Sequence, residues 1–167
     1  MDGLKMKQPL QFTEEGVFRV LMLSDIQESV NYDERSLKSV CALLDEAKPN
    51  LVIWGGDNCF GPEMHSLEDV KAFLDVFAAP MEERGIPWGH VFGNHDHDVP
   101  GDIRLHQALY EAYPMHVSGH TDETVSGTIL YYEKYCKNNQ NNYLCIDIHH
   151  IVGLQQQRRR QRNLHRQ

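Results

Sequence analysis

The chain has 167 residues, of which 41% are hydrophobic and 24% are charged, enough for one globular domain with its own core and too few for two. It has no apolar run near the roughly 18 residues that a membrane span needs and no apolar stretch at the N-terminus typical of a secretory signal. Its 4 cysteines lack the spacing of a zinc knuckle or a disulfide framework. We therefore expect a cytoplasmic protein without a membrane partner.

Charge is distributed unevenly along the chain. There are 24 acidic and 16 basic residues, and five of the bases are arginines within residues 158–166, so the body holds 24 acids and 11 bases. An acidic body does not suit a nucleic-acid backbone, whereas it suits a protein that holds cations. Residues 153–167 are rich in Gln and Arg, and we predict a disordered tail; nucleic-acid binding through its arginines is a third, less favoured hypothesis.

Strands and helices are predicted to alternate after a polar lead-in at residues 1–16. Residues 17–23 form an apolar run that predicts a buried strand. Helical spacing of apolar residues over 33–48, closed by Pro49, predicts a helix. Residues 51–54 predict a second buried strand.

The pattern continues through the middle of the chain. Ser66 opens a capping box ahead of a helical apolar stripe that reaches Phe77, and Pro80 should kink or end this helix, although residues 81–84 could continue it to Gly85. The remaining predicted elements are a strand at 86–92, a short helix from Asp102 to Tyr113, and strands at 127–132 and 143–148 around a polar connection at 134–142.

The order β-α-β-α-β predicts an α/β fold with a parallel sheet covered on both faces. The predicted strands end in polar residues, at Asp25, at Asp57 and at Asn94-His95-Asp96, spaced 32 and 37 residues apart. Ligands of such sheets lie outside the carboxyl ends of the strands. We therefore expect these side chains to meet at one edge, where an aspartate can bridge two metal ions about 3.5–4 Å apart.

These motifs resemble a known family. Ser24-Asp25-Ile26-Gln27, Gly56-Asp57-Asn58 and Gly93-Asn94-His95-Asp96 are similar to the first three motifs of the calcineurin-like metallophosphoesterases, and closest to the intracellular group related to purple acid phosphatases. The resemblance covers roughly residues 17–150, and we assign residues 17–152 to a phosphoesterase domain. It implies a metallophosphoesterase-type α/β sandwich, of which this chain would hold the N-terminal part.

The resemblance also implies an activity and a role for each residue. Asp25 would bind the first metal ion, Asp57 would bridge both, and Asn94 would bind the second. His95 would act as an acid or stabilise the phosphate, with Asp96 orienting it. The implied function is hydrolysis of a phosphate ester by a metal-bound hydroxide, with two divalent or trivalent ions such as Mn, Fe or Zn.

Two departures from the family pattern stand out. Gln27 occupies a position where the family usually has histidine, which would loosen the first metal site or favour a harder cation. The two later histidine segments of the family have only imitations here, at His120 and at His149-His150. These departures motivate a second hypothesis, in which a degenerate relative uses the phosphoesterase scaffold as a non-catalytic binding module.

Some neighbouring residues have plainer interpretations. We predict that Trp54 and Trp88 are core residues and that Cys59 is a small packed residue. We expect His97 and Asp98 to be solvated neighbours of the third motif. A partial parallel sheet with an open edge also predicts self-association.

Overall fold

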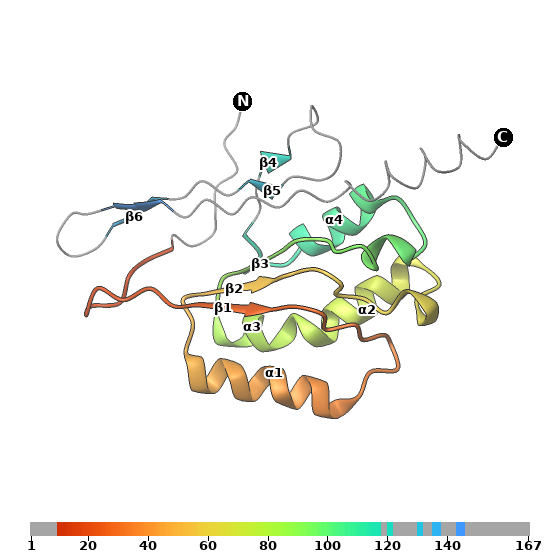
Figure 1. Ribbon diagram of the computed structural model, residues 1–167, viewed down its shortest axis with the longest axis horizontal. Coiled ribbons are helices and arrows are strands. Elements are labelled where there is room, and N and C mark those ends of the chain that lie inside the picture. Colours follow the sequence, from red (N-terminus) through yellow and green to blue (C-terminus); the bar gives the residue numbers. More distant parts are fainter. Residues whose placement is uncertain (1–9, 118–119, 122–129, 132–134, 138–142, 146–167) are drawn as a thin grey trace, which may run out of the picture.

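The computed structural model describes residues 10–117 in full, and the backbone of four short strands further along the chain. Three parallel strands form its central sheet in the order β1-β2-β3, namely β1 (Val20–Leu23), β2 (Leu51–Trp54) and β3 (Trp88–His90) (Figure 1). Leu21 pairs with Val52, which in turn pairs with Trp88. The predicted β-α-β-α-β order and the parallel α/β sheet are confirmed.

The helices begin and end where the sequence carries cap residues. In α1 (Glu34–Ala47) the Asp33 carboxylate accepts a hydrogen bond from the Arg35 amide, and in α2 (Leu67–Phe77) the Ser66 hydroxyl accepts one from the Asp69 amide. These bonds use amides that a helix leaves free in its first turn. Pro80 lies in the first turn of a separate helix, α3 (Ala79–Arg84), and α4 (Ile103–Glu111) starts after Asp102.

One apolar cluster joins the four helices to one face of the sheet. It contains Trp54 and Trp88, both fully buried, with ring centroids 4.9 Å apart, and Tyr110 of α4 lies against them. The other buried members include Val40 and Leu44 of α1, Phe73, Leu74 and Phe77 of α2, and Met81 of α3. The expectation that both tryptophans belong to the core is confirmed.

The opposite face of the sheet differs from the prediction. Its buried members Leu51 and Ile53 contact Leu10 and Val117 rather than a helix. Strand β1 was predicted to be buried, but Val20 is 49% exposed and Met22 is 64% exposed. The reason is position, because β1 is the outer strand of this sheet in the described part and alternate side chains of a strand point to opposite faces.

Beyond residue 117 the described backbone forms two antiparallel pairs. β4 (His120–Thr121) pairs with β5 (Leu130–Tyr131), and β6 (Tyr135–Lys137) pairs with β7 (Tyr143–Cys145). β5 and β7 lie within the predicted strands, but β6 lies in the segment predicted as a polar connection, because Tyr135 and Cys136 interrupt its polar run. The predicted tail at 153–167 lies outside the described residues.

No described helix combines the length and apolarity that crossing a membrane requires.

Candidate metal centre

The loops that follow β1 and β2 run side by side beyond the ends of the strands. The Asp25 amide donates to the Gly56 carbonyl over 3.0 Å, and the Gln27 amide donates to the Asp57 carbonyl over 3.1 Å. A parallel bridge between Glu28 and Cys59 extends this pairing. The backbone therefore holds Asp25 and Gln27 next to Asp57, at the carboxyl edge of the sheet.

Three of the predicted metal ligands have unusual backbone conformations. Asp25, Gln27 and Asp57 have φ angles of 56°, 44° and 51°, and the other described non-glycine residue with a positive φ is Lys48, which caps α1. Such conformations cost of order 1–3 kcal/mol and concentrate at functional sites. Here they lie in the two loops that follow β1 and β2.

The third motif packs directly on the second. The His95 amide donates to Asp57 Oδ1 over 2.8 Å. A Cβ atom at Gly93 would lie 2.1 Å from that same oxygen, and one at Gly56 would lie 2.8 Å from the Gly93 nitrogen. Only glycine fits at Gly93 and Gly56, which explains why each motif carries glycine at this point.

Asp96 is a buried residue whose carboxylate links the second and third motifs through hydrogen bonds. Its Oδ1 accepts from the amides of Asn58 and Cys59 at 2.9 and 3.1 Å, and its Oδ2 accepts from the Gly93 amide at 2.7 Å. Burial raises the pKa of Asp96, and the three amide bonds oppose that shift. The carboxylate therefore ties the loop after β2 to the loop after β3.

The orientation of His95 differs from the prediction. His95 was expected to be held by Asp96, but the side-chain partner of its ring is Asp98, whose Oδ2 lies 2.9 Å from His95 Nδ1. The physical reason is that the described hydrogen bonds of Asp96 go to Asn58, Cys59 and Gly93. The hydrogen bond with Asp98 is the main cause that raises the pKa of His95, with further contributions from the charges of Asp57, Asp98 and Asp96.

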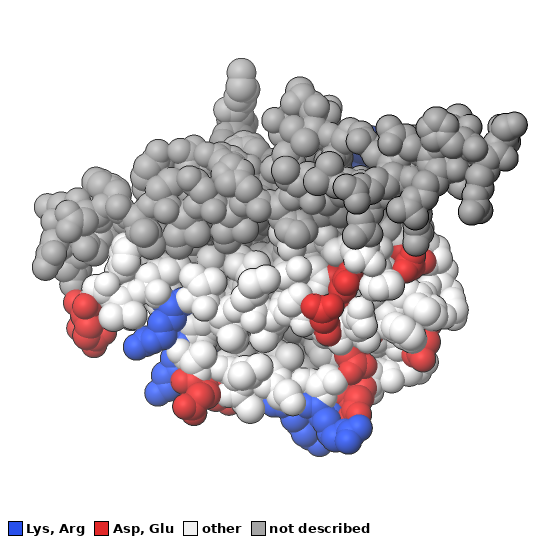
Figure 2. Space-filling view, viewed as in Figure 1, with Lys and Arg blue, Asp and Glu red and all other residues white. Residues whose placement is uncertain are grey.

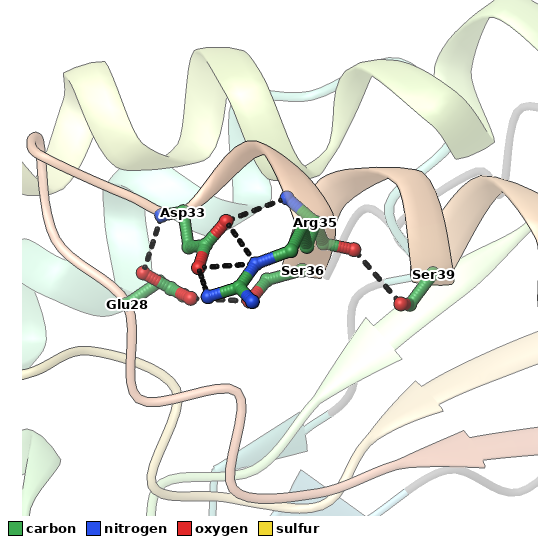
Figure 3. A network of polar contacts seen from close by, with 5 residues as sticks. All are labelled: Glu28, Asp33, Arg35, Ser36 and Ser39. Carbon is green, nitrogen blue, oxygen red and sulfur yellow. Dashed lines mark hydrogen bonds and ion pairs between the residues drawn. The ribbon is translucent and has the colours of Figure 1, made fainter.

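The loop that carries Asp25 and Gln27 is also tied to the start of α1. Figure 3 shows Glu28 accepting hydrogen bonds from the Asp33 amide and from the Ser36 hydroxyl. On its other side, the Glu28 carbonyl accepts from the Phe60 amide over 2.9 Å. Glu28 therefore links the loop after β1 to both α1 and the loop after β2.

The side chains predicted as metal ligands, Asp25, Gln27, Asp57 and Asn94, would bind a cation through oxygen atoms. Asp25 and Asp57 each have one carboxylate oxygen engaged, by the Ser24 hydroxyl and by the His95 amide, and the described residues form no hydrogen bond to the other oxygen of either carboxylate. Asp25, Gln27 and Asn94 are exposed and Asp57 is half-buried. This donor set fits a hard cation in kind, and it is small for two ions. Within the described residues no three His, Cys, Asp or Glu side chains gather in a way that could hold a metal ion.

The histidines that imitate the later segments of the family lie beyond the part whose side chains are described. His120 lies in β4, where only the backbone is described, and His149-His150 lies outside the described residues. Asn58 is fully buried, and its side-chain amide donates to the Val91 carbonyl; the sequence analysis placed it in the second motif without giving it a role. Its place directly after Gly56-Asp57 was the available signal.

The loops that follow β1, β2 and β3 carry Asp25, Gly56-Asp57 and Gly93-Asn94-His95-Asp96 in turn. The family model of the calcineurin-like phosphoesterases matches residues 18–167. The chain belongs to this family.

The similar proteins are phosphatases or are named after them. The chain is 36% identical over 104 residues to phosphatase DCR2 of Saccharomyces cerevisiae, covering 53% of this chain and 18% of the relative. It is 28% identical over 106 residues to the probable inactive purple acid phosphatase 28 of Arabidopsis thaliana, covering 54% and 26%. The matches thus extend over about a quarter or less of the length of these relatives.

Proposed function

We propose that this protein is a metal-dependent phosphoesterase that hydrolyses a phosphate ester with two bound metal ions. The observation that carries this proposal is the position of Asp57, whose backbone pairs with the loop of Asp25 and whose side chain contacts the loop of Asn94. A carboxylate between two ligand-bearing loops is the arrangement that a bridging ligand needs. The family and the phosphatase relative support the same reaction class.

We assign each side chain a role in binding the metal ions or the substrate. Asp25 and Gln27 would hold one ion, Asn94 would hold the other, and Asp57 would bind both. The ions, such as Mn, Fe or Zn, would supply positive charge for the phosphoryl group and lower the pKa of a water molecule. His95, exposed at the same edge, would hold a proton for the departing oxygen or bind a phosphate oxygen.

Hydrolysis of an aryl phosphate with added Mn²⁺, Fe or Zn²⁺ tests this proposal. We expect Asp57→Asn to abolish the activity and His95→Ala to lower it by 10²-fold or more. Asp75→Asn is the matched control, since Asp75 lies on α2 and pairs with the exposed Lys71. Equal rates in all four proteins would refute the catalytic function.

A second candidate function is a non-catalytic module that keeps the phosphoesterase scaffold. It is favoured by the small donor set, with an amide at Gln27, and by the name of the Arabidopsis relative described above, which calls that protein probably inactive. A wild-type protein that binds metal ions but hydrolyses none of a range of phosphate esters would favour this module over the enzyme.

The other expectations from the sequence stay predictions. They are a phosphate ester as the substrate, no membrane or nucleic-acid partner, a cytoplasmic location, and self-association through the open sheet edge. The last has some structural support, because Val20 and Met22 are exposed on β1, the outer strand of this sheet in the described part.

A further inference from the structure

We propose that Asp98 is a positioning residue for His95, fixing the orientation and tautomer of its ring, and that Gly61 makes this possible by leaving room for Asp98. The inference rests on the proposed function, in which His95 faces the substrate. It concerns a contact that the sequence pattern did not indicate, since Asp98 read as a solvated neighbour.

The local geometry brings the two side chains together. His95 immediately precedes a short 3₁₀ helix, η2 (Asp96–Asp98), and the Asp98 amide donates to the His95 carbonyl over 2.9 Å. In a 3₁₀ turn the residues i and i+3 are stacked above one another. This places Asp98 Oδ2 2.9 Å from His95 Nδ1.

A second loop holds Asp98 from the other side. The 3₁₀ helix η1 (Gly61–Glu63) follows the second motif, and Gly61 packs against Asp98. A Cβ atom at Gly61 would lie 2.7 Å from the Asp98 Cβ and 3.2 Å from its carbonyl carbon. Any larger residue at Gly61 would therefore push Asp98 away from its present place, and with it the carboxylate that contacts His95.

The contact has a chemical consequence for the imidazole. A carboxylate accepts hydrogen bonds only, so His95 Nδ1 carries the proton in this pair. In the neutral ring, Nε2 is then the unprotonated nitrogen, and the described residues form no hydrogen bond to it. The partner of Nδ1 therefore decides which nitrogen of His95 is available to a substrate.

The contact between His95 and Asp98 contributes little to folding stability. Both side chains are more than half exposed, His95 by 53% and Asp98 by 55%, and ion pairs of this kind add little to folding stability. A purely structural role would predict a change in stability and none in the tautomer. The positioning role predicts the reverse.

Long-range ¹H–¹⁵N spectra of the histidine rings, recorded without metal at a pH where the ring is neutral, test the proposal. We expect the wild-type protein to show the Nδ1-protonated tautomer at His95. Asp98→Ala should shift its ring nitrogens toward the Nε2-protonated form, and Gly61→Ala should cause a shift in the same direction. The exposed His65 is an internal reference, and Gly85→Ala is the control, because a Cβ atom at Gly85 meets no other atom within 4 Å.

Circular dichroism and the unfolding midpoint accompany the spectra. A folded Asp98→Ala protein with unchanged His95 nitrogens would overturn the proposal, and so would its failure to fold, because an exposed positioning residue should be dispensable for folding. Neither result would bear on metal binding by Asp57. Conversely, loss of the proposed function would leave the tautomer result standing, since the measurement needs neither metal nor turnover.

Discussion

The His95 amide lies 2.8 Å from Asp57 Oδ1, and this hydrogen bond connects the residues proposed for proton transfer and metal bridging. It orients the Asp57 carboxylate from the loop after β3. It also makes the position of Asp57 depend on Gly93, whose missing side chain leaves space for the same oxygen. The second and third motifs therefore form one structural unit rather than two separate groups of ligands.

Gly93→Ala should destroy this unit. Its Cβ atom would lie 2.1 Å from Asp57 Oδ1 and 2.4 Å from the Asp57 nitrogen, so the two loops must separate. We expect a loss of about 3 kcal/mol or more in the free energy of unfolding, measured with denaturant. Gly85→Ala is the control, with a positive φ of 62° but open space, and should cost about 1 kcal/mol. Equal losses would contradict the close packing at Gly93.

Asp96→Asn should destabilise the protein although it preserves size. The amide group offers one oxygen where the carboxylate uses both, so one of its hydrogens would face a backbone N–H of Gly93, Asn58 or Cys59. An unsatisfied buried donor costs about 1–3 kcal/mol, which chemical denaturation can resolve. Asp45→Asn, at an exposed ion pair with Arg84, should cost less than about 1 kcal/mol. If the two variants were equally stable, the hydrogen bonds of Asp96 would not be what holds the loops after β2 and β3 together.

Two buried histidines should make the protein sensitive to acid. His90 Nδ1 and His116 Nε2 lie 2.9 Å apart. Burial, with the His116 charge a lesser cause at His90, lowers the pKa of His90 well below 6.5, and burial lowers that of His116 to about 3. Below pH 6.5 the unfolded chain therefore takes up protons that the folded protein does not. Stability should be full above pH 6.5 and fall toward pH 3, by roughly 1.4 kcal/mol per pH unit for each histidine.

Unfolding free energies of the metal-free protein between pH 7.5 and about pH 4.5 test this expectation. His116→Phe should reduce the slope, whereas His65→Phe, at an exposed position, should leave it unchanged. A stability that does not change between pH 6.5 and pH 5 would show that the pair is not kept neutral by burial.

Self-association through β1 should depend on its exposed apolar face. Figure 2 shows few charged side chains over the middle of the face where β1 lies in Figure 1, with charged side chains on either side of it and below it. Val20→Lys should reduce association at rising protein concentration, because a lysine on an edge strand disfavours pairing with another strand. Leu105→Lys, at a similarly exposed residue of α4, is the control. Sedimentation that is identical for all three proteins would rule out this edge as the interface.

Much of the fold could be predicted because its signals are local. Asp33 and Ser66 cap helices through amides two or three residues away, and Pro80 and Gly85 bound α3 through their own backbone preferences. The exposure of Val20 could not be predicted in this way. It depends on which strand lies at the outside of the sheet, and an apolar run is the same at the edge and in the centre.

In the candidate site, too, some features follow from the sequence and others depend on tertiary packing. That the loops of Asp25, Asp57 and Asn94 meet could be predicted, because the carboxyl ends of parallel strands lie at one edge of a sheet. The metal-binding roles of these residues stay predictions. The partner of His95 could not be predicted, because Asp96 and Asp98 are both close in sequence, and the choice depends on burial of Asp96 by the loop of Asn58 and on the room left by Gly61. The contact between His90 and His116, 26 residues apart, has no sequence signal either.

The bridging position of Asp57 is tested most directly by counting metal ions. Titration calorimetry of the metal-free protein with Mn²⁺, followed by elemental analysis, should give two ions for the wild-type protein and for Asp75→Asn. Asp57→Asn should lose both, because each ion would share that carboxylate. Binding of two ions by Asp57→Asn with unchanged affinity would contradict the proposed centre, as would a wild-type protein that binds none.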